Sequence, residues 1–392
     1  MKKLLIIGFI FLSFFISSIM AKAPKIVVFT SDGGNGHKTA CEVLKETFPD
    51  CEIKLVNPIY DFFKNVFDGE GFYNKVIQSG WIHTSNFVAR YIGKPFFKIR
   101  TSSFKKRFLK YLENEKPDVL ISVIPLINYP AAWAANKCNI PFFIITLDAD
   151  LELWLLNMEK CHNLKFNITV NAKTQRIKKQ LKQKRIPESC VLEVGSPLRK
   201  NFLEQKDCAS IRKEWNIPED KKVIMLMRGG TGSVRLVDYV RSLAKINKPI
   251  HLLVCVGRNS KLIPKINRIK TNEMVTFSVI PFTQKIPELM SISDLLITQP
   301  SPNVCNEAMH MNLPILIDRA MPSLFWEKAT IDWIHMQGNG TVFRSVRRLN
   351  KLVESYLDKK NICETKKLKK ELSFNTQIRN LVMKSLENKN IA

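Results

Sequence analysis

Two series of short apolar runs, separated by helix-like stretches, constrain the fold of this 392-residue chain more than any other feature. Strands that are apolar on both faces are typical of parallel sheets covered by helices on both sides. The first series comprises residues 26–29, 52–56, 119–124, 142–147, 167–170 and 191–194, and the second comprises residues 223–227, 250–256, 275–280, 295–298 and 315–317. The sequence thus predicts an α/β protein with two Rossmann-like domains that face each other across a cleft.

The expected linker between the domains begins at Gly195-Ser196-Pro197, where a glycine and a proline interrupt the alternation of strands and helices. We therefore expect one domain over residues 24–200 and the other over residues 201–365. A lysine-rich tail over residues 366–392 has a helical pattern.

A glycine-rich turn, Ser31-Asp32-Gly33-Gly34-Asn35-Gly36-His37, follows the first predicted strand and leads into a helix predicted over residues 39–48. Glycines let the backbone approach a ligand, and a helix start offers N–H groups and a positive dipole end. Asp32 and His37 add a carboxylate and an imidazole, which are suited to acid–base chemistry. The turn matches neither the Rossmann G-x-G-x-x-G nor a P-loop, and an ordinary turn with a solvated histidine is an equally good interpretation.

The chain is strongly basic, with 61 Lys and Arg against 35 Asp and Glu and a formal charge of +26. This excess favours an anionic partner such as acidic lipid headgroups, a phosphorylated substrate or nucleic acid. No recognisable nucleic-acid module accompanies the charge, so we do not expect a nucleic acid partner. The nine cysteines form no C-x-x-C pair, which argues against a zinc site or a disulfide framework and favours a reducing compartment.

Residues 1–23 have the pattern of a membrane-targeting segment. Two lysines precede an apolar stretch over residues 4–20, and Ala21-Lys22-Ala23 follows it. The pattern fits a cleaved signal peptide, and the uncharged stretch is also just long enough for a retained membrane anchor. We expect a membrane-associated protein, and the sequence leaves open which alternative applies and which side of the membrane the chain occupies.

The segment over residues 59–97 interrupts the strand–helix alternation and is rich in aromatic residues. These are Tyr60, Phe62, Phe63, Phe67, Phe72, Tyr73, Trp81, Phe87, Tyr91, Phe96 and Phe97. A pair of covering helices with ordinary core aromatics would produce this pattern, and so would an amphipathic surface that enters a lipid bilayer.

Motifs in the second half make the interpretation specific. They are Arg228-Gly229-Gly230-Thr231-Gly232, Pro281-Phe282-Thr283, Gln299-Pro300-Ser301-Pro302 and Asn306-Glu307-Ala308, in this order. The series resembles the monogalactosyldiacylglycerol synthase and processive diacylglycerol glucosyltransferase family, which has the GT-B fold. The turn at residues 31–37 resembles the family's S-D-x-G-G-G-H turn, and the resemblance extends from about residue 25 to residue 343. It implies a C-terminal helix that returns to the N-terminal domain.

The resemblance implies that the N-terminal domain binds a lipid acceptor. Asp32 would be the base that deprotonates the acceptor hydroxyl, and His37 would position the acceptor or support that carboxylate. The other acceptor contacts would come from the glycine turn and the aromatic segment, through Gly33, Gly34, Gly36, Tyr73, Asn74 and Trp81.

The resemblance also implies that the C-terminal domain binds a UDP-sugar, with no cofactor and no metal. Glu307 would accept both ribose hydroxyls, and a helix predicted over residues 303–311 would direct its positive end at the diphosphate. The donor residues would be Arg228, Gly229, Gly230, Gly232, Phe282, Ser301, Asn303 and Glu307, with Phe282 facing the uracil. A helical glutamate paired with a surface lysine competes with the ribose role, and core packing competes with the uracil role.

The chain departs from the family pattern at several donor positions. The family's K-P-G-G reads Gln299-Pro300-Ser301-Pro302 here, and Pro302 has no N–H to offer a phosphate. Arg228 replaces a glycine of the donor loop, and its guanidinium would compensate by meeting the diphosphate. Of the family's G-Q-E-x-G-N stretch only Glu327 is kept, and no histidine matches the family's near Asp148.

We therefore expect a membrane-associated hexosyltransferase that moves galactose or glucose from a UDP-sugar to diacylglycerol with inversion. The basic surface and the aromatic segment would hold it on an anionic bilayer. One alternative is a transferase that moves N-acetylglucosamine from UDP to a polyprenyl-linked acceptor. Another is a GT-B scaffold or binding protein that has lost turnover.

Overall fold

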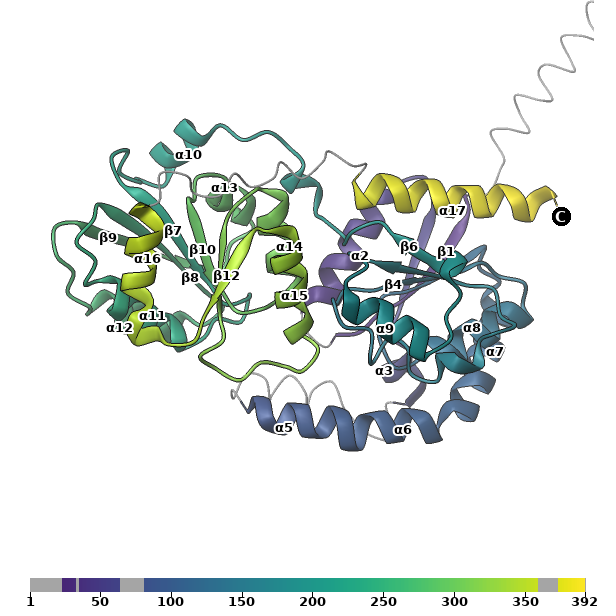
Figure 1. Ribbon diagram of the computed structural model, residues 1–392. Helices are drawn as coiled ribbons and strands as arrows, with labels where there is room; N and C mark the ends of the chain where they lie inside the picture. Colours follow the sequence, from purple (N-terminus) through teal and green to yellow (C-terminus); the bar gives the residue numbers. More distant parts are fainter. Residues whose placement is uncertain (1–22, 33–34, 64–80, 359–372, 392) are drawn as a thin grey trace, which may run out of the picture.

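The structure is a computed structural model that describes residues 23–32, 35–63, 81–358 and 373–391 (Figure 1). Two six-stranded sheets form two lobes, as the two series of apolar runs predict. The N-terminal sheet has the order β2-β1-β3-β4-β5-β6, and the C-terminal sheet has the order β12-β11-β10-β7-β8-β9. Every pairing is parallel, and Phe29 of β1, for example, lies between Val56 of β2 and Ser122 of β3.

The strands begin and end within a few residues of the predicted runs. In the N-terminal lobe they are β1 (Lys25–Phe29), β2 (Glu52–Val56), β3 (Val119–Ser122), β4 (Phe142–Ile145), β5 (Asn167–Val170) and β6 (Val191–Glu193). In the C-terminal lobe they are β7 (Lys222–Met227), β8 (Ile250–Gly257), β9 (Val275–Pro281), β10 (Leu295–Thr298), β11 (Ile315–Asp318) and β12 (Gly340–Phe343). The sequence did not predict β12, an edge strand that begins with glycine and buries only its last residue fully.

Helices connect the strands in both lobes. The N-terminal lobe contains α2 (Asn35–Thr47), α3 (Pro58–Phe63), α5 (Ile82–Phe87), the π-helix η1 (Val88–Gly93), α6 (Lys94–Ile99), α7 (Thr101–Glu115), α8 (Asn128–Lys137), α9 (Gln175–Gln183) and the 3₁₀ turns η2 (Met158–Lys160), η3 (Glu188–Cys190) and η4 (Lys200–Phe202). The C-terminal lobe contains α10 (Cys208–Glu214), α11 (Arg235–Leu243), η5 (Ser260–Leu262), α12 (Ile263–Asn267), α13 (Ile286–Ser291), α14 (Pro302–His310), α15 (Lys328–Gln337), η6 (Val346–Arg348) and α16 (Leu349–Asp358). The last helix is α17 (Phe374–Ile391).

Both faces of the C-terminal sheet are buried, which explains why its strands are apolar throughout. Along β7, Val223 and Met225 pack into a core with residues of α14 and α15, whereas Ile224 and Leu226 pack into a second core with residues of α11 and α16. Successive side chains of a strand point to opposite faces, so alternation between two cores requires an uninterrupted apolar sequence.

The C-terminal helix α17 returns to the N-terminal lobe, as the resemblance predicts (Figure 1). Its apolar residues Phe374, Ile378, Val382 and Leu386 recur at every fourth position and join the N-terminal core. Arg379 fixes the register, because its guanidinium donates to the backbone oxygen of Thr47 and to Asp50. The domain boundaries given above stay predictions.

Within the ranges that the structure describes, no helix combines the length and the apolar character that a membrane crossing requires. The predicted targeting segment, apart from its last residue, lies outside those ranges.

Candidate functional site

Topology alone indicates where each sheet binds a ligand. In open α/β sheets, ligands bind at the carboxyl ends of the strands, beside the point where the strand order reverses. That point lies between β1 and β3 in the N-terminal sheet and between β7 and β10 in the C-terminal sheet. The predicted glycine turn follows β1, residues 228–232 follow β7, and Ser301 follows β10. The three motifs singled out in the sequence therefore lie at the two reversal points.

His37 lies in the first turn of α2 with a defined protonation state. Its Nδ1 atom is 2.7 Å from the backbone oxygen of Val123, which follows β3. A carbonyl oxygen only accepts hydrogen bonds, so Nδ1 carries the proton and donates it. Burial lowers the pKa of His37 below its usual value, against a smaller opposing effect of this hydrogen bond. The ring is therefore neutral at pH 7, and its Nε2 atom carries a lone pair that can accept a proton.

Asp32, the predicted base, is more exposed than His37. Its carboxylate lies 3.4 Å from the ammonium of Lys38, and 69% of its side chain is exposed. The side-chain amide of Asn57 donates to it at 3.5 Å. Asp32 and His37 thus flank the same turn, with the carboxylate in a hydrated position and the imidazole in a partly buried one.

The N-terminal ends of α2 and α14 approach each other across the boundary between the lobes. A Cβ atom built on Gly36 would lie only 2.8 Å from the Nδ2 atom of Asn303. Glycine at this position allows the approach, because any side chain would displace the Asn303 amide. This contact brings the predicted acceptor turn, with His37, to the predicted donor helix, with Asn303 and Glu307.

The start of α14 is suited to an anion. Ser301 adopts the extended conformation of an N-cap residue, Pro302 occupies the first helical position, and the Ser301 side chain makes no capping hydrogen bond. The N–H groups of the first turn are therefore left to a ligand or water, and they lie at the positive end of the helix dipole.

Glu307 is buried on α14 and paired with an arginine from the chain segment that joins the lobes. Its Oε1 atom accepts a hydrogen bond from Nη2 of Arg199 at 2.8 Å. Burial raises the pKa of Glu307, and Arg199 opposes that rise through its charge and its hydrogen bond. The competing interpretation of a glutamate paired with a surface lysine is wrong, because the partner is a partly buried arginine. No pattern in the sequence indicates Arg199 as a partner of Glu307.

The loop after β7 packs directly against the end of β8. Gly229 and Gly232 have positive φ angles of 73° and 71°. A Cβ atom on Gly232 would lie 2.0 Å from the backbone oxygen of Val256. The oxygen of Gly230 accepts a hydrogen bond from the N–H of Arg258 at 3.0 Å. These contacts require glycine and give the loop a defined shape at the reversal point.

Arg228, just before that loop, is engaged in a buried network. Its Nη1 atom donates to Asp318 at 2.8 Å and also to the hydroxyl of Tyr239, which in turn donates to Asp318. Only 9% of the Arg228 side chain is exposed. In this conformation Tyr239 and Asp318 hold the guanidinium, and its contact with a diphosphate stays a prediction.

Phe282 follows β9 and is 43% exposed, so the competing interpretation of a core phenylalanine is wrong. The guanidinium carbon of Arg258 lies 4.1 Å from the centroid of its ring. An exposed ring with a cation over it is compatible with stacking on a uracil, which stays a prediction.

The predicted acceptor residues are only partly described. Trp81 precedes α5 and is 62% exposed. Gly33, Gly34, Tyr73 and Asn74 lie outside the described residues.

Two further partly buried carboxyl groups come from opposite lobes. Asp148 follows β4 and accepts a hydrogen bond from the indole of Trp154 at 2.9 Å, and burial raises its pKa to about 6. Glu327 precedes α15 and accepts from the backbone N–H of Leu324, and burial raises its pKa to about 8. The charge of Asp148 also contributes to the raised pKa of Glu327. Glu327 is therefore largely protonated at neutral pH, and a protonated carboxyl both donates and accepts hydrogen bonds.

Solved structures identify this architecture as the GT-B glycosyltransferase fold, as predicted. MurG of Acinetobacter baumannii has a TM-score of 0.63 at 14% identity, over 92% of this chain and 99% of that chain. Anabaena HepE in complex with UDP-glucose has a TM-score of 0.52 at 14% identity, over 93% and 99%. The UDP-GlcNAc 2-epimerase of Neisseria meningitidis bound to UDP-GlcNAc has a TM-score of 0.56 at 15% identity, over 93% and 100%.

Two curated relatives are similar to this chain along most of its length. The chain is 24% identical to the processive diacylglycerol beta-glucosyltransferase of Bacillus licheniformis, over 88% of this chain and 90% of the relative. It is also 24% identical to the protein of the same name from Bacillus subtilis, over 84% and 85%. No family model matches the chain. The predicted resemblance to the diacylglycerol glucosyltransferases is confirmed along most of the chain.

Proposed function

We propose that the chain is a membrane-associated glycosyltransferase that moves a hexose, glucose or galactose, from a UDP-sugar to diacylglycerol with inversion. The observation that carries the proposal is the approach of Gly36 to Asn303, because it brings a neutral imidazole close to a helix start that is suited to an anion. A transferase needs both at one place: a base for the acceptor hydroxyl and a cradle for the departing diphosphate. The names of the curated relatives support the donor and acceptor classes.

The proposed reaction is a single displacement. The Nε2 atom of His37 removes the proton of the acceptor hydroxyl, and the resulting oxygen attacks the anomeric carbon. The bond between that carbon and the diphosphate oxygen breaks on the opposite face, which inverts the configuration and releases UDP. Asp32 is the alternative base, and its exposure and its pairing with Lys38 make it the less favoured one.

The donor would lie against α14 and the loop after β7. The N–H groups at the start of α14 would stabilise the charge that develops on the diphosphate, so the proposal includes no metal and no cofactor. Glu307 would accept the ribose hydroxyls through the oxygen that Arg199 does not bind. Phe282 would contact the uracil, and residues 229–232 would bring backbone amides to the donor.

The acceptor side would lie on a lipid surface. Exposed apolar side chains lie along the helical run of α5, η1 and α6. They are Phe87, Tyr91, Ile92 and Ile99, and Trp81 lies just before the run. Basic residues alternate with them, including Lys98 and Arg100, as in helices that lie in an anionic membrane interface. This arrangement favours the lipid-surface interpretation of the aromatic segment.

The test uses the full chain in mixed micelles that contain diacylglycerol and one radiolabelled donor at a time: UDP-glucose, UDP-galactose or UDP-N-acetylglucosamine. We expect label from one of the hexoses in a chloroform-soluble product of inverted configuration. The His37→Gln variant serves as the matched control and should bind UDP without transferring sugar.

Two results would contradict the proposal. Transfer of N-acetylglucosamine to a polyprenyl-linked acceptor, and not of hexose to diacylglycerol, would establish the alternative transferase. UDP binding without transfer to either acceptor would establish a binding or scaffold protein.

A further inference from the structure

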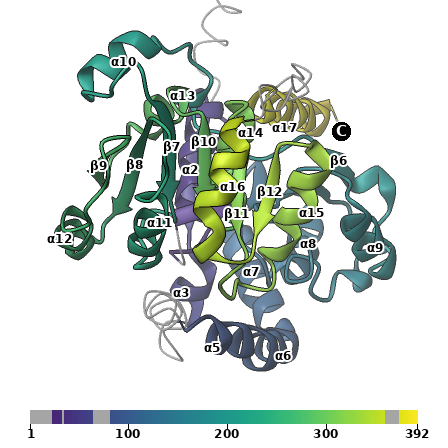
Figure 2. The ribbon, with the colours of Figure 1, turned by 60° about the vertical axis from the view of Figure 1, so that its left-hand side comes forward.

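One helical run of the N-terminal lobe supports a loop of the C-terminal lobe. Helices α5, η1 and α6 lie end to end beneath the boundary between the lobes (Figures 1 and 2). The loop of residues 319–327, which joins β11 to α15, rests on this run. We call this loop the 319–327 loop; Glu327 is its last residue.

Asn86 of α5 binds the loop as a peptide group would. Its side-chain amide donates to the backbone oxygen of Ser323 at 3.1 Å, and its side-chain oxygen accepts from the N–H of Phe325 at 2.9 Å. The two contacts bind backbone groups two residues apart, so they fix the conformation of the loop and not only its position. They join residues that are more than 230 positions apart in the chain.

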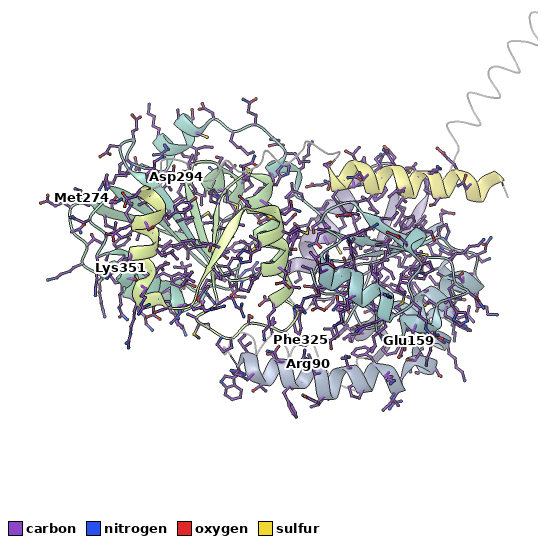
Figure 3. The ribbon with its side chains drawn as sticks, viewed as in Figure 1. Arg90, Glu159, Met274, Asp294, Phe325 and Lys351 are labelled. Carbon is purple, nitrogen blue, oxygen red and sulfur yellow. The ribbon has the colours of Figure 1, made fainter. Side chains whose placement is uncertain are left out.

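Arg90 of η1 adds a stacking contact one turn further along. Its guanidinium lies 4.3 Å from the centroid of the Phe325 ring, and Figure 3 shows the two side chains together where the lobes meet. Glu152 of the N-terminal lobe restrains Arg90, because its Oε2 atom lies 3.6 Å from Nη2 of the guanidinium. Its Oε1 atom accepts a hydrogen bond from Nζ of Lys94 at 2.8 Å. The planar guanidinium is thus restrained on its polar edge while its face covers the aromatic ring.

Hydrogen bonds within the 319–327 loop connect the residues that Asn86 binds to Glu327. The side-chain carboxyl group of Glu327 accepts a hydrogen bond from the N–H of Leu324, and the backbone N–H of Glu327 donates to the oxygen of Leu324 at 3.1 Å. Leu324 lies between Ser323 and Phe325, the two residues that Asn86 binds. A change at Asn86 therefore reaches the Glu327 carboxyl through a single residue.

We propose that Asn86 and Arg90 are positioning residues of the transfer reaction, which hold the 319–327 loop on the N-terminal lobe and thereby fix Glu327 at the boundary of the lobes. The inference rests on the proposed function for its kinetic consequence alone. Neither residue touches the predicted base or the predicted diphosphate site, so each acts through the loop. The same contacts connect the C-terminal lobe to the helical run of α5, η1 and α6, which carries the exposed apolar residues.

The test compares Asn86→Ala and Arg90→Lys with Asn114→Ala, an exposed asparagine near the end of α7 that lies outside the helical run. Hydrogen exchange followed by mass spectrometry should show faster exchange in residues 323–327 of Asn86→Ala, with exchange in the rest of the C-terminal lobe unchanged. In the micelle assay, Asn86→Ala should lower kcat on the order of tenfold, because a misplacement of about 1 Å caused by a distant substitution can lower a rate by up to about 10²-fold. Arg90→Lys keeps the charge and loses the stacking, so its loss of kcat should be smaller, and Asn114→Ala should behave as the wild type.

A second measurement separates positioning from a general structural role. In the Glu327→Gln background, Asn86→Ala should cause little further loss of kcat, because both changes act through the same carboxyl. Independent losses that multiply would overturn the proposal, and so would unchanged exchange in residues 323–327. If the wild type transfers no sugar while the exchange result is as expected, the proposed function fails and the restraint itself stands.

Discussion

The ion pair of Arg199 and Glu307 allows a prediction with two independent measurements. One substitution there should change both the thermal stability of the protein and its KM for the UDP-sugar. Arg199→Met removes the cation and keeps an apolar side chain of similar length. The side chains of Arg199 and Glu307 are 18% and 11% exposed, so the change leaves a mostly buried carboxylate without its partner. Breaking a buried pair costs about 3–5 kcal/mol, and the residual hydration favours the lower end, about 3 kcal/mol. For a lobe of this size that corresponds to a fall in Tm of about 6–12 °C.

The pH dependence has a definite sign. Burial raises the pKa of Glu307, and Arg199 opposes that rise, so the pKa rises further in Arg199→Met. A carboxyl with a raised folded-state pKa binds more protons in the native state than in the unfolded state, so stability falls as pH rises above the unfolded value of about 4.3. The Tm of Arg199→Met should therefore approach that of the wild type near pH 4 and fall furthest below it at pH 8.

The assay is differential scanning calorimetry from pH 4 to pH 8, with donor kinetics at pH 6 and pH 8. The double variant Arg199→Met/Glu307→Gln should recover most of the lost stability, because it leaves no unpaired charge. The KM for the UDP-sugar should rise in Arg199→Met, most at pH 6, where Glu307 is more protonated. An equal Tm deficit at pH 4 and pH 8, or an equal deficit in the Glu307→Gln background, would refute the reasoning.

The remaining predictions concern the base, the lobe contact, the buried carboxyl and the metal. His37→Gln should lower kcat by about 10²–10⁴ and leave UDP binding intact, whereas Asp32→Asn should lose less; the reverse order in a turnover assay would assign the base to Asp32. Gly36→Ala should retain the Tm of the wild type, because only the flexible Asn303 amide must move, yet transfer should fall; unaffected transfer would show that the contact is not used. The native pKa of Glu327 is about 8, so wild-type stability should fall between about pH 5 and pH 8 by up to about 1.4 kcal/mol per unit, and Glu327→Gln should gain in relative Tm over that range; a pH-independent difference would contradict the burial argument. Treatment with EDTA should leave the rate unchanged, and a loss restored by Mg²⁺ would disprove the metal-free proposal.

The sequence predicted the sheets because their signal is local. Strands such as β8 are buried on both faces, so every residue reports burial and the run is visible without knowledge of its neighbours. The edge strand β12 has one fully buried residue and begins with glycine, so its run carries no such signal. The motifs at the reversal points were visible for the same reason, since each follows a strand directly.

The contacts between the lobes could not be read from the sequence. Arg199 and Glu307 are 108 positions apart, and Asn86 and Phe325 are 239 apart, so no periodicity or spacing relates them. Which ring nitrogen of His37 carries the proton depends on the backbone oxygen of Val123, which lies at the end of another strand. Local patterns indicate which residues lie at a strand end, whereas pairing across lobes follows from the packing of the whole chain.

The return of α17 has a consequence for synthesis of the protein. Translation completes β1 to β6 early, but the apolar surface that receives Phe374, Ile378 and Val382 stays uncovered until α17 leaves the ribosome. The core of the N-terminal lobe is therefore completed only after the C-terminal lobe has been synthesised. A chain that stops before α17, or loses it to proteolysis, would expose that apolar surface to proteases and to aggregation.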